Sequence, residues 1–251
     1  MSVAADAIMG SMTSVPRRTT PAAVKVHDTI LDRLGERIVS GQVPAGERLV
    51  AADWGEELGA SRTAVREAVR VLESLGMVSV RRKSGITIRP STDWMAFAPE
   101  IVRWRLRGAG RLVQLHELSE LRAAVEPAAA RLAASTADGV ARAALGAAVQ
   151  DMVTHADRAN GADYLAADVR FHATLLRASG NSMFAGLTAV IEEVLVGRTE
   201  QELMPQTADE TALRLHQEVA HAITRRDGEA AARAMTAIVD EADRAVQSLP
   251  L

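Results

Sequence analysis

The stretch from residue 111 to residue 247 is the feature that most constrains the fold. It is rich in Ala and Leu, and its apolar residues recur at helical spacing in about six segments. The segments span residues 113–134, 138–157, 161–178, 182–202, 208–225 and 228–247. Gly180-Asn181 and Asp227-Gly228 mark two of the breaks. No repeat of fixed length is present, which favours one helical bundle over a solenoid.

The preceding residues predict a smaller and different unit. Ser61 is placed to cap a helix that Gly76 ends, and the segment 81–85 is basic. The expected elements are helices over 21–40, 51–58 and 63–75 and β-prone runs over 77–80 and 86–88. Three helices followed by a small hairpin with a basic tip are typical of a winged helix-turn-helix.

We therefore expect a mainly α chain of two domains, which suits a length of 251 residues because single cores stop growing at roughly 250 residues. The predicted order is a disordered tail over 1–20, a winged helix-turn-helix DNA-binding domain over 21–90, a linker over 91–110 and an all-helical ligand-binding domain over 111–247.

Two absences narrow the function. No apolar window approaches the roughly 18 residues of a membrane-spanning helix, and the N-terminus lacks the order of a signal peptide, so we expect a cytoplasmic protein with no membrane partner. The chain has no Cys, which excludes disulfides, thiolate nucleophiles, zinc fingers and iron–sulfur clusters. Any metal must be held by His and carboxylates.

Charge is distributed unevenly along the chain. The overall charge of −3 argues against nucleic-acid binding, yet residues 61–89 hold seven basic and two acidic residues. Residues 93–251 hold 16 Arg against 22 acidic residues. The basic surplus lies on the second helix of the helix-turn-helix and on the hairpin tip, the two elements expected to touch DNA.

The segment beginning at Ser61 suits DNA reading. Arg62 and Arg66 are four residues apart and project from one helical face, while Val65 lies on the face that packs into the domain. Each Arg is able to contact guanine through two hydrogen bonds, and Ser61 and Thr63 are able to donate to phosphate. The alternative is a solvated amphipathic helix with ordinary surface arginines.

The runs SGQVPAGERL and LGASRTAVREAVRVLESLGMVSVRRKSGITI resemble the winged helix-turn-helix of the GntR family of bacterial transcription regulators. The resemblance implies DNA contacts from the recognition helix at Ser61, Arg62, Thr63 and Arg66, and a wing tip formed by Arg82, Lys83 and Gly85. Ala52 departs from the family pattern, since some members place an Arg there to bind phosphate. The affinity for DNA is then expected to depend more on the wing than it does in those members.

Three residues of the helical region have the spacing of a metal site. Asp168 and His172 share one helical face, and His216 lies on a later helix. One oxygen and two nitrogen donors suit Zn, Mn, Ni or Fe. The alternatives are a surface Asp–His pair and an ordinary half-buried His216. Arg122 and Glu126, one turn apart, are by default a helix salt bridge.

The runs ELRAAVEPAAARLAA, DVRFHATLLRASGN and HQEVAHAITRRDGEAAARAMTAI resemble the helical effector (FCD) domain of the FadR-type branch of that family. The resemblance implies that Asp168, His172 and His216 hold a divalent metal (Zn, Mn or Ni) and that Arg122 binds an effector carboxylate. The usual fourth ligand position is Ile238, and Glu241 one turn beyond is an alternative donor. The stretch from Asp93 to Arg105 resembles members that respond to sugar acids.

The resulting hypothesis is a homodimeric transcription regulator, with repression as the default, whose affinity for a double-stranded DNA operator is controlled by a small carboxylate such as a sugar acid. It is not expected to be an enzyme. One alternative is a metal-dependent enzyme that uses Asp168, His172 and His216. Another is a DNA-packaging protein indifferent to sequence.

Overall fold

The computed structural model describes residues 21–81, 85–200 and 203–247. The predicted tail over 1–20 lies outside these residues. The first part, the head, contains, in chain order, α1 (Pro21–Val39), β1 (Arg48–Leu49), α2 (Ala51–Glu57), α3 (Arg62–Ser74), β2 (Val78–Arg81) and β3 (Gly85–Ile88). The predicted mainly α architecture, with a winged helix-turn-helix ahead of a helical bundle, is confirmed.

Apolar faces of α1 and α3 meet in the core of the head. Leu34 of α1 and Val65 and Leu72 of α3 are each at most 1% exposed, and Trp54 of α2 lies in the same cluster. The sheet is antiparallel with strand order β1-β3-β2. The sequence predicted only the hairpin of β2 and β3. The two-residue β1 was missed because strands this short carry no periodicity.

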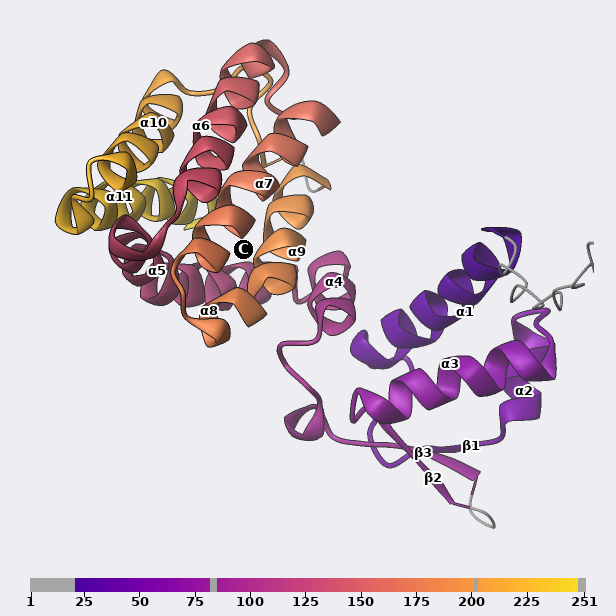
Figure 1. Ribbon diagram of the computed structural model, residues 1–251. Helices are drawn as coiled ribbons and strands as arrows, with labels where there is room; N and C mark the ends of the chain where they lie inside the picture. The colour runs from indigo at the N-terminus through magenta and orange to yellow at the C-terminus, as the bar shows by residue number, and fades with distance from the viewer. Residues whose placement is uncertain (1–20, 82–84, 201–202, 248–251) are drawn as a thin grey trace, which may run out of the picture.

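The second part of the chain is the helical bundle, shown at the upper left of Figure 1. Its elements are α5 (Arg111–Thr136), α6 (Gly139–Thr154), the 3₁₀ turn η2 (Ala156–Arg158), α7 (Ala162–Ala178), α8 (Ser182–Gly186), α9 (Thr188–Glu200), α10 (Glu210–Thr224) and α11 (Gly228–Gln247). The largest apolar cluster joins α5, α6, α7, α10 and α11.

The expectation of one helix over 182–202 is wrong, because the chain forms α8 and α9 there. The break lies at Leu187, whose N–H donates to the carbonyl of Phe184 in a tight turn. The Thr188 hydroxyl donates to the carbonyl of Ala185 across the same turn. Gly186 stands directly before the break, but an isolated Gly within a helical pattern is tolerated, which explains why the pattern did not mark the break.

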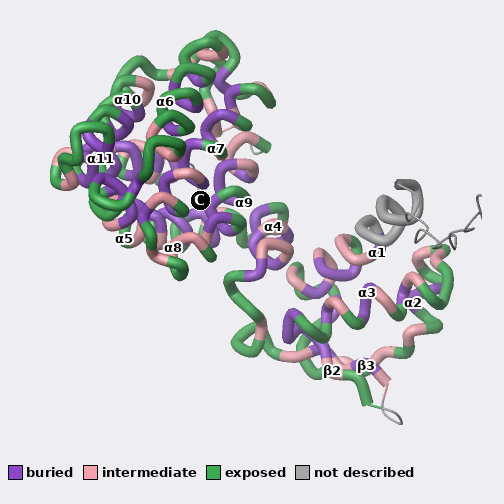
Figure 2. The backbone as a smooth tube through the Cα atoms, viewed as in Figure 1, coloured by how far each residue is buried: buried purple, intermediate pink, exposed green. Residues whose placement is uncertain are grey.

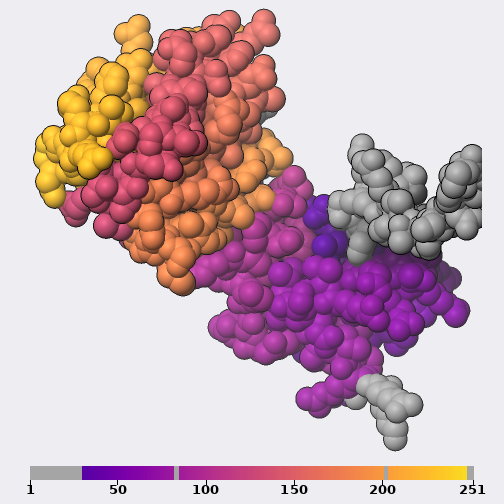
Figure 3. All heavy atoms as spheres, in the orientation of Figure 1, coloured from indigo at the N-terminus to yellow at the C-terminus, as the bar shows by residue number. Residues whose placement is uncertain are grey.

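Residues 91–110, the expected linker, contain the 3₁₀ turn η1 (Ser91–Asp93) and the helix α4 (Pro99–Arg107). The helix α4 packs against α1 of the head and against α5 and α9 of the bundle (Figure 1). Buried residues run along α4 as well as through both larger bodies (Figure 2), and in the space-filling view the head and the bundle meet across this region (Figure 3).

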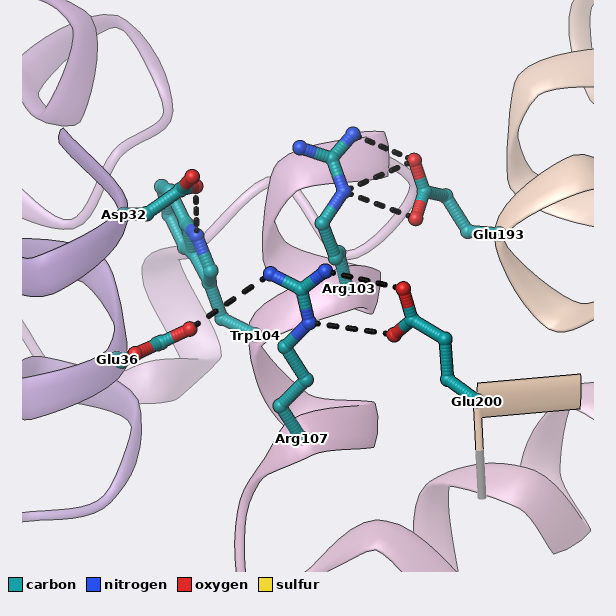
Figure 4. Close-up of polar contacts among 7 residues, drawn as sticks. All are labelled: Asp32, Glu36, Arg103, Trp104, Arg107, Glu193 and Glu200. Carbon is teal, nitrogen blue, oxygen red and sulfur yellow. Dashed lines mark hydrogen bonds and ion pairs between the residues drawn. The ribbon is translucent and has the colours of Figure 1, made fainter. Parts of the chain in front are cut away.

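Side chains on opposite faces of α4 hold the two bodies (Figure 4). On the head side, the indole Nε1 of Trp104 donates to Asp32 over 2.8 Å. On the bundle side, Arg103 donates from Nε to both carboxylate oxygens of Glu193, at 3.1 and 3.0 Å. Arg107 lies between the two, 3.3 Å from Glu200 and 3.8 Å from Glu36. The segment expected to be a linker is therefore a packed helix with contacts on both sides.

The contact between Gly35 and Trp104 generates a stability prediction. A Cβ atom on Gly35 would lie 2.5 Å from the Trp104 ring, so Gly35→Ala must displace the indole from its packed position. We expect a loss of about 1–3 kcal/mol of stability and a lower melting temperature in thermal unfolding. The control is Gly146→Ala on the exposed side of α6, where a Cβ meets nothing within 4 Å and is expected to stabilise the helix slightly. Equal melting of Gly35→Ala and the parent would contradict this packing.

Candidate DNA-binding face and ligand cavity

The helix α3 presents the expected DNA-reading residues to solvent. Ser61 is its N-cap, with Oγ accepting a hydrogen bond from the amide of Ala64 over 3.2 Å. Arg62, Thr63 and Arg66 are exposed, and the first turns of the helix are uncovered on that face. Neither Arg62 nor Arg66 forms an ion pair within the described part of the chain. Both guanidinium groups are thus available to a nucleic acid.

The wing is described only in part. Arg82 and Lys83 lie outside the described residues. Gly85 begins β3 with φ of +74°, and a Cβ there would lie 2.5 Å from the carbonyl oxygen of Leu49. The position therefore requires glycine for two reasons, its backbone conformation and the close approach of β1.

A cavity of about 270 Å³ lies in the bundle among α5, α7, α9, α10 and α11. Its polar lining includes Arg122, Asp168, His172, Arg198 and His216. The three residues predicted as metal ligands come together here, since one donor atom from each of Asp168, His172 and His216 lies within 4.8 Å of the other two. All three side chains are buried.

An acceptor oxygen lies beside the Nδ1 atom of each of the two imidazoles. His216 Nδ1 lies 2.7 Å from the carbonyl oxygen of Ala212, which accepts only from a protonated nitrogen. His172 Nδ1 lies 2.9 Å from Glu126 Oε2. His172 Nδ1 makes this ion-pair contact but no hydrogen bond among the described residues, whereas His216 Nδ1 is a donor. The Nε2 atoms face Asp168 Oδ1, at 3.3 Å from His172 and 3.5 Å from His216. Partners of this kind orient histidine ligands in metal sites.

The donor set of this group fits a divalent cation. Asp168 Oδ1, His172 Nδ1 and His216 Nε2 are buried, and none of them has a hydrogen-bond partner among the described residues. Burial raises the pKa of Asp168, but His172 and His216 outweigh it and hold that pKa well below its usual range. Burial lowers the pKa of His172, yet Glu126 and Asp168 raise it to about 9. Lone pairs that converge in this way need a positive charge between them, which a proton or a metal ion supplies.

The wall beside this group does not carry the usual fourth ligand. Ile238 lines the cavity with an apolar side chain. Glu241 lines it as well, and burial followed by the charge of Asp209 raises its pKa, but it is not part of the close group of three. The described residues thus bring together three donors.

Arg122 and Glu126 form a buried pair, where the residues alone predicted an ordinary helix salt bridge. They are 2% and 0% exposed, and Arg122 Nε donates to Glu126 Oε1 over 2.8 Å. Burial raises the pKa of Glu126, but Arg122 and His172 lower it to about 2. Glu126 therefore connects the arginine to the histidine group, a role that sequence reasoning missed because the contact crosses from α5 to α7.

Two further residues of the cavity were also missed. Tyr164 of α7 lies within the buried lining, and burial raises the pKa of its hydroxyl. Arg198 of α9 lines the cavity too. Their only signal in the sequence is a polar residue beside an apolar run, which is too common to single them out.

Two family matches cover most of the chain. Residues 27–88 match the family described as bacterial regulatory proteins, gntR family, and residues 117–241 match the FCD domain. The chain is 29% identical over 231 residues to the galactonate operon transcriptional repressor of Escherichia coli, covering 88% of this chain and 97% of that protein. It is 31% identical to the uncharacterized HTH-type transcriptional regulator Rv0494 of Mycobacterium tuberculosis, covering 71% of this chain and 72% of that protein.

Solved structures agree at the level of the fold. The structure superimposes on that of Lar, a protein that controls the expression of the Listeria monocytogenes agr system. The TM-score is 0.54 at 19% identity, over 93% of this chain and 100% of that one. Within the described ranges, no helix has the length and apolar character needed to span a membrane. The head, the bundle and these matches lead to one conclusion: the chain belongs to the GntR family of transcription regulators, with a C-terminal FCD domain.

Proposed function

We propose that the protein is a cytoplasmic repressor whose affinity for its operator is controlled by a small carboxylate bound in the bundle. One observation carries the proposal: the cavity joins a buried cationic residue, Arg122, to a convergent donor group of Asp168, His172 and His216. A carboxylate placed there would pair with a guanidinium, and a metal held by the donor group would bind its oxygen atoms.

The sugar-acid class is supported by similarity. The related Escherichia coli protein is named for the galactonate operon. A sugar acid supplies one carboxylate for an arginine and neighbouring hydroxyls for polar groups. When bound, a divalent metal would supply a Lewis-acidic centre for such oxygen atoms, and Asp168, His172 and His216 would hold it. Glu126 would orient His172 in that site.

DNA reading is assigned to α3 and the wing. In a helix-turn-helix, the N-terminal residues of the second helix meet base edges in the major groove. Arg62 and Arg66 are proposed to read bases, Ser61 and Thr63 to bind phosphate, and Arg82, Lys83 and Gly85 to form the wing contact. Two copies related by a two-fold axis would then read the halves of a pseudo-palindromic operator.

The experiment that tests the carboxylate is a thermal-shift screen of the full-length protein, starting with D-galactonate and D-gluconate, with and without divalent metal. A specific ligand raises the melting temperature in proportion to the logarithm of its concentration. We expect a sugar acid to bind without turnover and to weaken operator binding. Consumption of the bound carboxylate would instead favour the metal-dependent enzyme.

The DNA-reading residues generate a second prediction. Arg62→Ala and Arg66→Ala are each expected to weaken operator binding by about 1–3 kcal/mol, roughly 5- to 150-fold, because each loses a contact to a base. Binding to a scrambled duplex of the same length should change much less. Arg214→Ala is the control, since that exposed arginine of α10 pairs with Glu218. Equal losses on operator and scrambled DNA would support the packaging alternative.

The metal generates a third prediction. Purified protein is expected to contain a divalent metal that His172→Ala loses, because the variant removes one of three donors. Elemental analysis measures the bound metal per chain. His116→Ala is the control, since His116 is exposed and lies outside the cavity. Parent protein that binds none after incubation with Zn²⁺, Mn²⁺ or Ni²⁺ would refute the metal site.

A further inference from the structure

Arg198 on α9 is a positively charged residue of the cavity to which the proposed function gives no role. Its side chain lines the cavity, and its Nε atom is buried with no hydrogen-bond partner within residues 21–81, 85–200 and 203–247. Arg122 differs, because its Nε and one Nη donate to Glu126. A buried guanidinium N–H without an acceptor costs free energy, so a fold keeps one only where something else compensates for it.

The charges around Arg198 indicate what is missing. Burial and then the charge of Arg122 lower the pKa of Arg198, whereas Asp168, Glu241 and Tyr164 attract it without bonding to its Nε. Asp168 faces the two histidines instead. The cavity thus contains a second cationic donor that no described side chain satisfies at Nε, and an anionic oxygen is the acceptor that a guanidinium prefers.

We infer that Arg198 binds the carboxylate group of the effector and is the residue that links effector binding to the DNA-binding head. The inference rests on the proposed function, and it extends the site from Arg122 on α5 to a second guanidinium on α9. An anion between the two arginines relieves their repulsion and supplies the acceptor that Arg198 lacks.

The position of Arg198 on α9 provides the link. The preceding residue, Gly197, lies so close to Leu106 of α4 that a Cβ on it would be 2.7 Å from the leucine Cδ1. One residue therefore faces the cavity while its neighbour touches the helix that joins the two bodies. Glu193 and Glu200 of the same α9 bond Arg103 and Arg107 of α4 (Figure 4).

The path continues from α4 into the head. Trp104 is bonded to Asp32 and packs on Gly35, and Arg107 also reaches Glu36 (Figure 4). A movement of α9 that follows carboxylate binding therefore acts directly on α4 and, through α4, on α1. Since α1 packs on α3, the orientation of the recognition helix depends on the same contacts.

The first test measures binding of D-galactonate, D-gluconate and a panel of other small carboxylates to full-length, metal-supplemented protein by calorimetry. We expect Arg198→Gln to raise the dissociation constant of the parent's best ligand at least tenfold and Arg198→Lys to have a smaller effect. Equal binding by parent and Arg198→Gln would overturn the inference and leave the proposed function intact. A parent that binds no carboxylate would overturn both.

A ligand-free measurement separates binding from a structural role. Because Arg198 Nε has no hydrogen-bond partner in the part of the chain that the structure describes, Arg198→Gln is expected to melt at the same temperature as the parent or higher, with an unchanged metal content. A lower melting temperature without ligand would show that Arg198 supports the fold, and would overturn its assignment to the effector.

The second test breaks the link and leaves the cavity unchanged. The double variant Arg103→Gln/Glu193→Gln removes the charged contact between α4 and α9. We expect it to bind the carboxylate within about twofold of the parent, while the factor by which the ligand weakens operator binding falls at least threefold. The matched control is Arg131→Gln/Glu229→Gln, an exposed ion pair away from α4. Full release of the operator in the first double variant would refute the route through α4.

Discussion

The buried carboxylate of Glu126 is the interaction on which the cavity depends. A charge with no exposure to water persists in a fold only if other groups compensate for it. Glu126 lies between Arg122 and His172. It neutralises the charge of the arginine through one carboxylate oxygen and contacts the imidazole through the other. Loss of Glu126 would leave Arg122 as an uncompensated cation and free His172 to rotate. The orientation of the donor group thus depends on the salt bridge between Arg122 and Glu126, which are one helical turn apart in α5.

The second organising element is α4, a helix of nine residues with two packed faces. Trp104 belongs to the core of the head, while Val102 and Leu106 belong to a cluster with Val190 and Val194 of α9. A helix of this kind restricts the positions that the head can adopt relative to the bundle. The helix that receives the charged contacts of α4 also contributes Arg198 to the cavity. In this fold, α9 therefore contributes both to the cavity and to the contacts with α4.

Several features of the head and the bundle were predictable from the local sequence pattern. The N-cap at Ser61, the exposed face of Arg62 and Arg66 and the stops at Gly76 and Gly180 follow from helix periodicity and backbone preference. The pairing of Asp168 with His172 follows from their spacing of four. The break at Leu187 does not, because it forms a local turn with Phe184 that the helical pattern does not mark. The strand β1 does not either, because pairing with the distant β3 selects it. The helix α4 was hidden in a stretch interrupted by Pro and Gly.

The sequence by itself determined which helices form, which of their faces are apolar and which residues could share a turn. Only the tertiary structure decided which faces meet. It brings His216 of α10 to Asp168 and His172, as the family resemblance implied. It also brings Glu126 of α5 to His172 of α7, and Arg198 of α9 into the same cavity, where its Nε has no hydrogen-bond partner among the described residues. The physical reason is that the spacing of apolar residues along a helix shows which side of the helix is buried, but not which other helix covers that side. The protonated nitrogen of an imidazole and the partner of a guanidinium depend on atoms contributed by helices far apart in the chain.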